Sequence, residues 1–182
     1  MKTTGLMFFC LLAGCFMNGC EPSSCGCVNH SDSPVLFAYR YTNWAWGYQE
    51  RGWMIDREGK VRAYNLPVNY RSPDSLGYLS EEDLYHNLAL TDTVIEILDP
   101  AEVDAYAALI PDAAGGELSE KENIAADAGS SVLTCYLYDN DKKAYRSVFL
   151  AMSGDWQQFN QSEPAQEIVD WLLELPVFWL SE

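Results

Sequence analysis

The chain has 182 residues, of which 27 are Asp or Glu and 11 are Lys or Arg, so its formal net charge is −16. This length suits one domain better than two. A hydrophobic content of 48% and an aromatic content of 13% exclude an intrinsically disordered chain. The excess of negative charge leaves no broad basic surface for phosphate backbones, so we do not expect nucleic acid as a partner.

The amino terminus has the pattern of a signal peptide. One cation, Lys2, precedes an uninterrupted apolar run from Gly5 to Ala13, which is too short to span a bilayer. The run ends in Leu12-Ala13-Gly14-Cys15, which resembles the lipobox of bacterial lipoproteins, here of an uncharacterised family. The resemblance implies removal of residues 1–14 and attachment of acyl chains to Cys15. An ordinary cleaved signal peptide, or cleavage before Cys20, is the alternative.

A lipid at Cys15 would set the location of the protein. Two or more acyl chains anchor a protein durably, and an acidic domain has little attraction of its own for anionic lipids. Residues 15–34 are rich in Ser, Asn, Pro and Cys and predict a flexible stalk, and residues 35–182 then form a single domain. We expect a lipoprotein anchored to a membrane of the bacterial cell envelope, facing outside the cytoplasm. Its partner there would be an envelope protein, a peptide or a glycan.

The cysteines suit an oxidising compartment. Cys10 belongs to the predicted signal peptide and Cys15 to the lipid anchor, which leaves four for disulfides or for unpaired thiols. Cys25-Gly26-Cys27 with His30 gathers residue types that bind metals. Zinc sites, however, favour two or more residues between paired cysteines and need a fourth ligand, so we predict no metal. The disulfide candidates are Cys20, Cys25, Cys27 and Cys135.

Two parts of the first half of the domain are predicted to form strands. Alternation of large residues over Val35 to Thr42 predicts a strand with Val35, Phe37, Tyr39 and Tyr41 on one side. After Thr42 the large residues change parity: they occupy even-numbered instead of odd-numbered positions. This change indicates a bulge or bend near Asn43. The segment from Asp56 to Gly59 has turn residues between two apolar segments and predicts a hairpin. Residues 67–79 read as a loop.

Capping residues predict three helices. Ser80, followed by acidic residues, favours a helix over residues 81–90. Asp99-Pro100 precedes apolar residues at helical spacing, in a helix that should stop before Pro111. Ser162 caps a third helix that ends at Pro176. Residues 91–98 are ambiguous between helix and strand.

The remaining segments complete the predicted fold. Residues 111–131 are mostly small and acidic. A connection of about twenty residues without regular structure is unusual inside a compact domain, so we expect it to be either mobile or functional. Residues 132–138 and 145–152 predict a second hairpin around Asp139 to Lys142. Asp139 and Asp141 resemble the start of a calcium loop, but Lys142-Lys143 occupies the place of further ligands. The order of elements predicts an α+β fold, an antiparallel sheet of about four or five strands packed on one face by two to four helices.

Catalytic motifs are absent from the sequence. It holds no nucleophile elbow, no H-E-x-x-H metal motif and no phosphate-binding loop. His86 is the sole imidazole of the predicted domain, and we interpret it as a solvated or capping residue. We therefore favour a non-catalytic protein and predict no catalytic residue and no cofactor. The alternative is a hydrolase or transferase that uses acidic residues near the aromatic-rich strands.

Aromatic residues are dense between residues 37 and 53. Large aromatic side chains are effective anchors for a protein, peptide or glycan when they are exposed. The same residues could instead form the inner face of the sheet against the predicted helix of Ile168 and Trp171, and for a chain of 48% hydrophobic residues we favour that interpretation. The change of parity near Asn43 means that one of the two aromatic groups could face outward and form a binding patch. The candidate binding residues are Trp44, Trp46, Tyr48 and Trp53.

Overall fold

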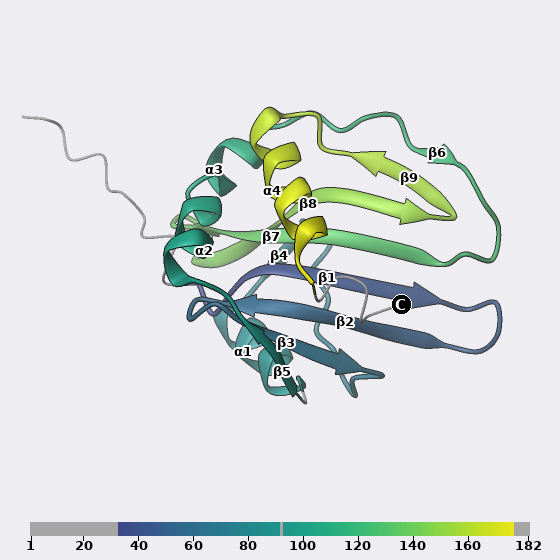
Figure 1. Cartoon of the computed structure of the whole chain (residues 1–182), viewed down its shortest axis with the longest axis horizontal. Coiled ribbons are helices and arrows are strands. Elements are labelled where there is room, and N and C mark those ends of the chain that lie inside the picture. Colours follow the sequence, from purple (N-terminus) through teal and green to yellow (C-terminus); the bar gives the residue numbers. More distant parts are fainter. Residues whose placement is uncertain (1–32, 92, 177–182) are drawn as a thin grey trace, which may run out of the picture.

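The structure is a computed structural model that describes residues 33–91 and 93–176 (Figure 1). The predicted signal peptide, the predicted lipidation site Cys15 and the disulfide candidates Cys20, Cys25 and Cys27 lie outside these residues, as does most of the predicted stalk. No helix of the described part is long and apolar enough to cross a membrane.

The described residues form one antiparallel sheet with helices on both faces. Along the sheet the strand order is β5-β3-β2-β1-β7-β8-β9-β6, and β4 pairs with β8. The strands are β1 (Val35–Asn43), β2 (Gln49–Asp56), β3 (Lys60–Asn65), β4 (Tyr78–Leu79), β5 (Thr93–Ile97), β6 (Glu122–Asn123), β7 (Ser130–Asp139), β8 (Ala144–Gly154) and β9 (Trp156–Phe159). The helices are α1 (Glu81–Ala89), α2 (Pro100–Ala107), α3 (Ile110–Ala113) and α4 (Glu163–Glu174).

The α+β class and the antiparallel sheet are confirmed, but the predicted strand number and the packing of helices on one face alone are wrong, since α1 covers the second face. The sheet has nine strands instead of four or five. The strands β4, β6 and β9 have two to four residues, too few to show a period in the sequence. The ambiguous segment 91–98 is the edge strand β5, which pairs with β3.

The predicted turn and caps are confirmed in atomic detail. Gly59 closes the turn between β2 and β3 in the left-handed region, and its N–H donates to the Asp56 carbonyl at 3.0 Å. The Ser80 hydroxyl accepts from the Asp83 N–H, and the Asp83 carboxylate accepts from the Ser80 N–H, which makes a capping box for α1. Ser162 accepts from the N–H of Ala165 at the start of α4.

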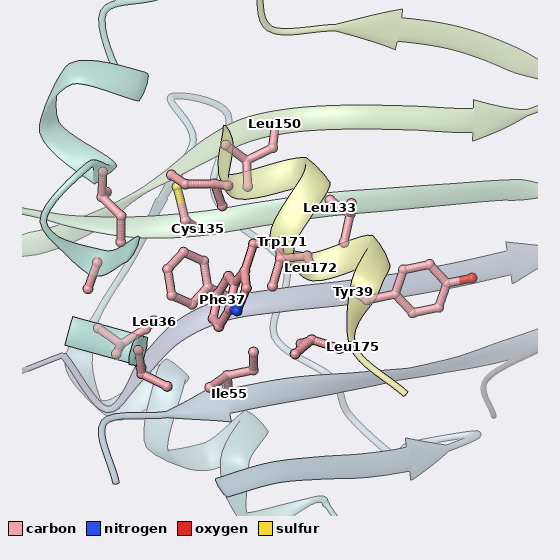
Figure 2. Close-up of a cluster of buried hydrophobic side chains, with 14 of the residues drawn as sticks. Leu36, Phe37, Tyr39, Ile55, Leu133, Cys135, Leu150, Trp171, Leu172 and Leu175 are labelled. Carbon is pink, nitrogen blue, oxygen red and sulfur yellow. The ribbon is translucent and has the colours of Figure 1, made fainter. Parts of the chain in front are cut away.

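The helices α2, α3 and α4 cover one face of the sheet, and α1 lies on the opposite face (Figure 1). On the first face, called here the helical face, Phe37 contacts Trp171 edge to face, with ring centroids 5.2 Å apart. Leu36, Tyr39, Ile55, Leu133, Cys135, Leu150, Leu172 and Leu175 belong to the same core (Figure 2). The opposite face buries Leu84 of α1 against Val35, Ala38 and Met54.

A bulge at the start of β1 changes the predicted facing of one residue. Between Val35 and Phe37 the register against β2 shifts, so that Leu36 and Phe37 both reach the core of the helical face. Val35 instead joins the core beneath α1. The predicted shared side therefore holds for Phe37 and Tyr39, with Tyr41 packed against the same core, but not for Val35.

The acidic connection 111–131 has more structure than predicted. Pro111 lies in the first turn of the short helix α3, where a missing N–H removes no helical hydrogen bond. Residues 122–123 form the edge strand β6, paired with β9. Backbone hydrogen bonds then join Ile124 and Ala125 to the carbonyl of Asp155.

Candidate functional site

Among the described residues, the two most exposed aromatic side chains, Trp44 and Trp46, lie at the turn between β1 and β2. This hairpin tip, residues 44–48, carries Trp46 at 83% exposure, Trp44 at 74% and Tyr48 at 43%. The rings of Trp44 and Tyr48 contact one another, with centroids 4.3 Å apart. The change of parity near Asn43 is thus a chain reversal, and it brings these three rings outside the sheet.

The base of the hairpin tip is fixed by Asn43, which is itself buried. Its Oδ1 accepts from the N–H of Ala45 at 2.8 Å. Its Nδ2 donates to the Tyr41 hydroxyl at 2.9 Å and to the Asp127 carbonyl at 3.1 Å. Gly47 supplies a positive φ of 98° inside the tip. The exposed rings therefore stand on a hydrogen-bonded base.

A second loop, residues 124–129, contacts the base of the hairpin tip. The Tyr41 hydroxyl donates to the Ala128 carbonyl at 3.3 Å. Asp155 stabilises the loop in turn, because its carboxylate accepts from the Ala128 N–H and its own N–H donates to the Gly129 carbonyl. Figure 1 shows the β1–β2 turn, this loop and the β8–β9 turn at the same end of the sheet.

Beneath the tip, three side chains form a polar chain on the α1 face of the sheet. Tyr48 donates a hydrogen bond to Oε2 of Glu50, and Arg40 Nε donates to Oε1 of the same carboxylate at 2.7 Å. The Glu50 side chain is only 4% exposed and that of Arg40 is 35% exposed. Both carboxylate oxygens are therefore occupied. Glu50 positions Tyr48 and, through it, the Trp44 ring.

The electrostatics of this chain follow from the same contacts. The hydrogen bond to Glu50 is the main reason that the pKa of Tyr48 is raised. Burial alone would lower the pKa of Arg40, but attraction to Glu50 helps to raise it above its ordinary value. The Arg40 guanidinium lies 4.9 Å from the Tyr70 ring centroid. Burial raises the pKa values of Tyr70 and its neighbour Tyr64.

Trp53, the fourth candidate binding residue, is fully buried on the helical face. Its ring stacks on Tyr39, with centroids 5.7 Å apart. Trp53 lies within β2, where successive side chains alternate between the two faces of the sheet, and its ring belongs to the helical face. Trp53 therefore belongs to the core and cannot contribute to an exposed binding surface without unfolding.

Cys135, the one disulfide candidate within the described residues, has a free thiol there. It is buried on β7 opposite Phe37 of β1. Burial is also the first cause of its raised pKa, so the reactive thiolate form is disfavoured.

The polar residues considered for metal or acid-base chemistry have structural roles. His86 Nε2 lies 3.0 Å from the Asn69 carbonyl and ties the loop before β4 to α1. Asp139 accepts from the N–H groups of Asp141 and Lys142 and so closes the β7–β8 turn. Within residues 33–91 and 93–176, no group of three or more His, Cys, Asp or Glu side chains could hold a metal ion.

The helical face carries two adjoining acidic grooves, of about 380 and 420 Å³. Trp171 lines both, and its Nε1 donates to Glu102 at 2.9 Å. Tyr106 stacks on Trp171, with centroids 4.2 Å apart. The carboxylates that line the grooves are those of Glu96, Asp99, Glu102, Glu163, Glu167, Asp170 and Glu174.

The side-chain contacts that support the hairpin tip were not predicted from the sequence. The ion pair between Arg40 and Glu50 joins β1 to β2. It depends on the register of these two strands, in which Arg40 lies opposite Gly52 and Thr42 lies opposite Glu50. The contact of Asn43 with residue 127 joins segments that are distant in the sequence. By contrast, the contact between Tyr48 and Glu50 joins residues close in the sequence, since they are two positions apart at the start of β2.

Comparison of the chain with protein-family models, with curated proteins and with solved structures finds no match.

Proposed function

We propose that this protein is a lipoprotein of the bacterial cell envelope whose domain binds a partner, without catalysis, through the hairpin tip. The observation that carries the proposal is the exposure of Trp44 and Trp46 on a base that hydrogen bonds hold in place. The partner would be an envelope protein, a peptide or a glycan.

The energetics of binding favour this surface. Trp side chains bring a large contact area with few rotatable bonds, and they are enriched among the residues that dominate interface energies. Since Asn43 and residues 124–129 already hold the turn, little backbone entropy is lost when a partner binds. Tyr48, supported by Glu50, extends the contact surface beside Trp44.

The buried carboxylates near these strands favour binding over the hydrolase or transferase alternative. Glu50 accepts from Tyr48 and Arg40. Asp56 accepts from the N–H groups of Glu58 and Lys60 and from Arg62 Nε. A general acid or base must reach a substrate proton, and these two carboxylates are instead saturated by protein donors.

The direction of β1 agrees with an anchor at the amino terminus. Val35 begins β1 at one end of the sheet, and Asn43 ends it at the hairpin tip. A nine-residue strand spans about 30 Å. A domain tethered through Cys15 would therefore present its exposed aromatic rings at the end farther from its tether.

Site-specific photo-crosslinking tests the binding surface. A benzophenone amino acid at position 46 in the full chain should give an adduct in cells, and a Trp44→Ala change in the same chain should reduce its yield. The matched control carries the probe at Val68, which is similarly exposed but lies in another loop. Equal labelling at both positions, or none at position 46 together with no binding to envelope glycans, would contradict the proposal.

Metabolic labelling tests the anchor separately. The full chain should incorporate palmitate and sediment with membranes, whereas a Cys15→Ser variant should lose both properties. A Cys20→Ser variant is the control for the alternative cleavage site. Retention of label and membrane association by Cys15→Ser would refute lipidation at this residue while leaving the binding surface untouched.

A further inference from the structure

The strand β5 forms one edge of the sheet, and its outer side has no strand partner among the described residues (Figure 1). Unpaired strand edges are templates for pairing with other chains, and proteins usually protect them with Pro, Lys, bulges or covering elements. β5 contains neither Pro nor Lys, and Ile97 is 65% exposed. The register against β3 shifts between the pairs of Val94 and Glu96, so the edge is regular at Glu96 and Ile97.

The main-chain groups of Ile97 point outward from this edge. Ile97 lies opposite Lys60, and the next residue, Leu98, donates its N–H to the Gly59 carbonyl at 2.9 Å. Ile97 and Lys60 therefore form a non-hydrogen-bonded pair, in which the N–H and C=O of each residue point away from the other strand. The Ile97 N–H bonds instead to the side chain of Glu96, at 3.2 Å. An added strand can replace this acceptor with a main-chain carbonyl and can also donate to the Ile97 carbonyl.

One of the two acidic grooves, that of about 420 Å³, borders the same edge and is called here the β5 groove. Leu98, Trp171 and Leu175 give it an apolar lining, and no Lys or Arg lines it. Long basic side chains suit such a groove, because their stems cover apolar surface while their charged ends meet the carboxylates. These carboxylates belong to Glu96, Asp99, Glu102 and Glu174.

Charge decides which kind of strand fits this edge. A second copy of this chain, with a net charge of −16, would bring its own Glu96 and Asp99 to the same groove. Like charges on paired strands destabilise the pairing. A segment that carries Lys or Arg replaces this repulsion with attraction.

We propose that β5 and the β5 groove bind an extended basic segment of a partner protein, which adds one antiparallel strand to the sheet. The residue of that segment opposite Ile97 is apolar and lies on the same face as Ile97. Its two neighbours alternate to the face of Glu96, where the groove lies, and are Lys or Arg. The segment therefore has the pattern basic, apolar, basic. This surface is separate from the hairpin tip.

Synthetic peptides test the proposal on the full chain. The probe alternates lysine with valine over about seven residues, the length of an ordinary strand. Its binding should shift the amide resonance of Ile97 and slow the exchange of that amide with solvent. The first control peptide has glutamate in place of lysine. The second is N-methylated at its valines and cannot donate to the Ile97 carbonyl. Each control should bind at least about tenfold more weakly, and added salt should weaken the lysine peptide.

Paired charge variants locate the groove. Glu96→Gln combined with Glu174→Gln should weaken binding of the lysine peptide at least about threefold, since two ion pairs are lost. Glu81→Gln combined with Glu82→Gln is the matched control. It makes the same change of charge at exposed positions of α1 and should leave the binding unchanged.

Two further variants separate the strand edge from the hairpin tip. Ile97→Pro removes the outward N–H without removing a main-chain bond to β3, and it should weaken the lysine peptide about as much as N-methylation does. Trp46→Ala at the hairpin tip should have no effect on this peptide. If Ile97→Pro does not fold, the two control peptides decide the question without it.

Equal binding of the lysine and glutamate peptides, or no response at the Ile97 amide, would overturn the proposal. Self-association that Ile97→Pro abolishes would also overturn it, because the occupant would then be a second copy. Binding that occurs only when the chain ends after Pro176 would do the same, since the chain itself would then compete for the edge.

Discussion

Trp46 and Trp53 lie on the same hairpin, seven positions apart, yet the first is 83% exposed and the second is completely buried. We expect Trp46→Ala to change the free energy of unfolding by less than about 0.5 kcal/mol, since an exposed ring has few native contacts to lose. Trp53→Ala should lower it by about 3–5 kcal/mol. Denaturant unfolding measures both. Comparable losses in the two variants would show that the hairpin tip is part of the core.

The Arg40–Glu50–Tyr48 chain should contribute to stability as well as to the position of Tyr48. Breaking a fully buried ion pair costs about 3–5 kcal/mol, but Arg40 is partly exposed, so we expect Glu50→Gln to lose roughly 1–2 kcal/mol. The control is Glu58→Gln, whose carboxylate pairs with Arg57 at the surface. That change should cost under about 0.5 kcal/mol. Equal effects on the denaturation midpoint would contradict a special role for Glu50.

Buried tyrosines should make the domain sensitive to alkali. Burial raises the pKa of Tyr64, Tyr70 and Tyr136 above the usual value. Above about pH 10 the unfolded chain releases phenolic protons that the folded chain retains, so the free energy of unfolding falls as pH rises. Below that pH these groups are protonated in both states and their effect is constant.

Unfolding followed at several pH values measures this dependence. Tyr64→Phe should make the decline above about pH 10 less steep, because one of the groups with a raised pKa is gone. Ionisation of all tyrosines with an ordinary midpoint near pH 10, in a chain that keeps its native circular dichroism, would argue against the raised pKa values.

Gly52 should be intolerant of any side chain. A Cβ at this position would overlap the main-chain oxygen of Tyr39 and approach the Tyr64 hydroxyl to 2.6 Å. We expect Gly52→Ala to cost about 1–3 kcal/mol or more, because the central strands cannot separate without losing hydrogen bonds. Gly115→Ala is the control, since its Cβ would make only one ordinary contact, 3.7 Å from the Asp112 carbonyl oxygen. Similar midpoints for the two variants would mean that β1 and β2 adjust freely.

Local chemistry explains which elements could be predicted from the sequence. The turn at Asp56 to Gly59 and the caps at Ser80, Asp99 and Ser162 depend on residues only a few positions apart, and all four form as expected. The short strands β6 and β9 form only by pairing, β6 with β9 and β9 also with β8, which no short stretch of the sequence shows. The sequence likewise does not show on which face of the sheet α1 packs, because this depends on the path of the whole chain.

The candidate site also has features that could be predicted from the sequence and features that could not. The aromatic density around Trp44, Trp46 and Tyr48 was visible in the sequence, and the parity change indicated that one aromatic group could face outward. Which group is exposed depends on the position of the chain reversal. The network that supports the tip needs the pairing of β1 with β2 and the approach of residues 127–128, contacts that only the folded chain brings together.

The central position of β1 has a consequence for how the protein is made. Its first neighbour, β2, follows directly, but its second neighbour is β7, and Phe37 pairs with Cys135. Closing a loop of about a hundred residues is slow, and a chain rich in such distant contacts folds slowly. A chain that emerges amino terminus first carries one edge of its middle strand unpaired until Cys135 is available. During that interval the edge is open to pairing with other chains, so the nascent protein should depend on folding assistance more than its size suggests.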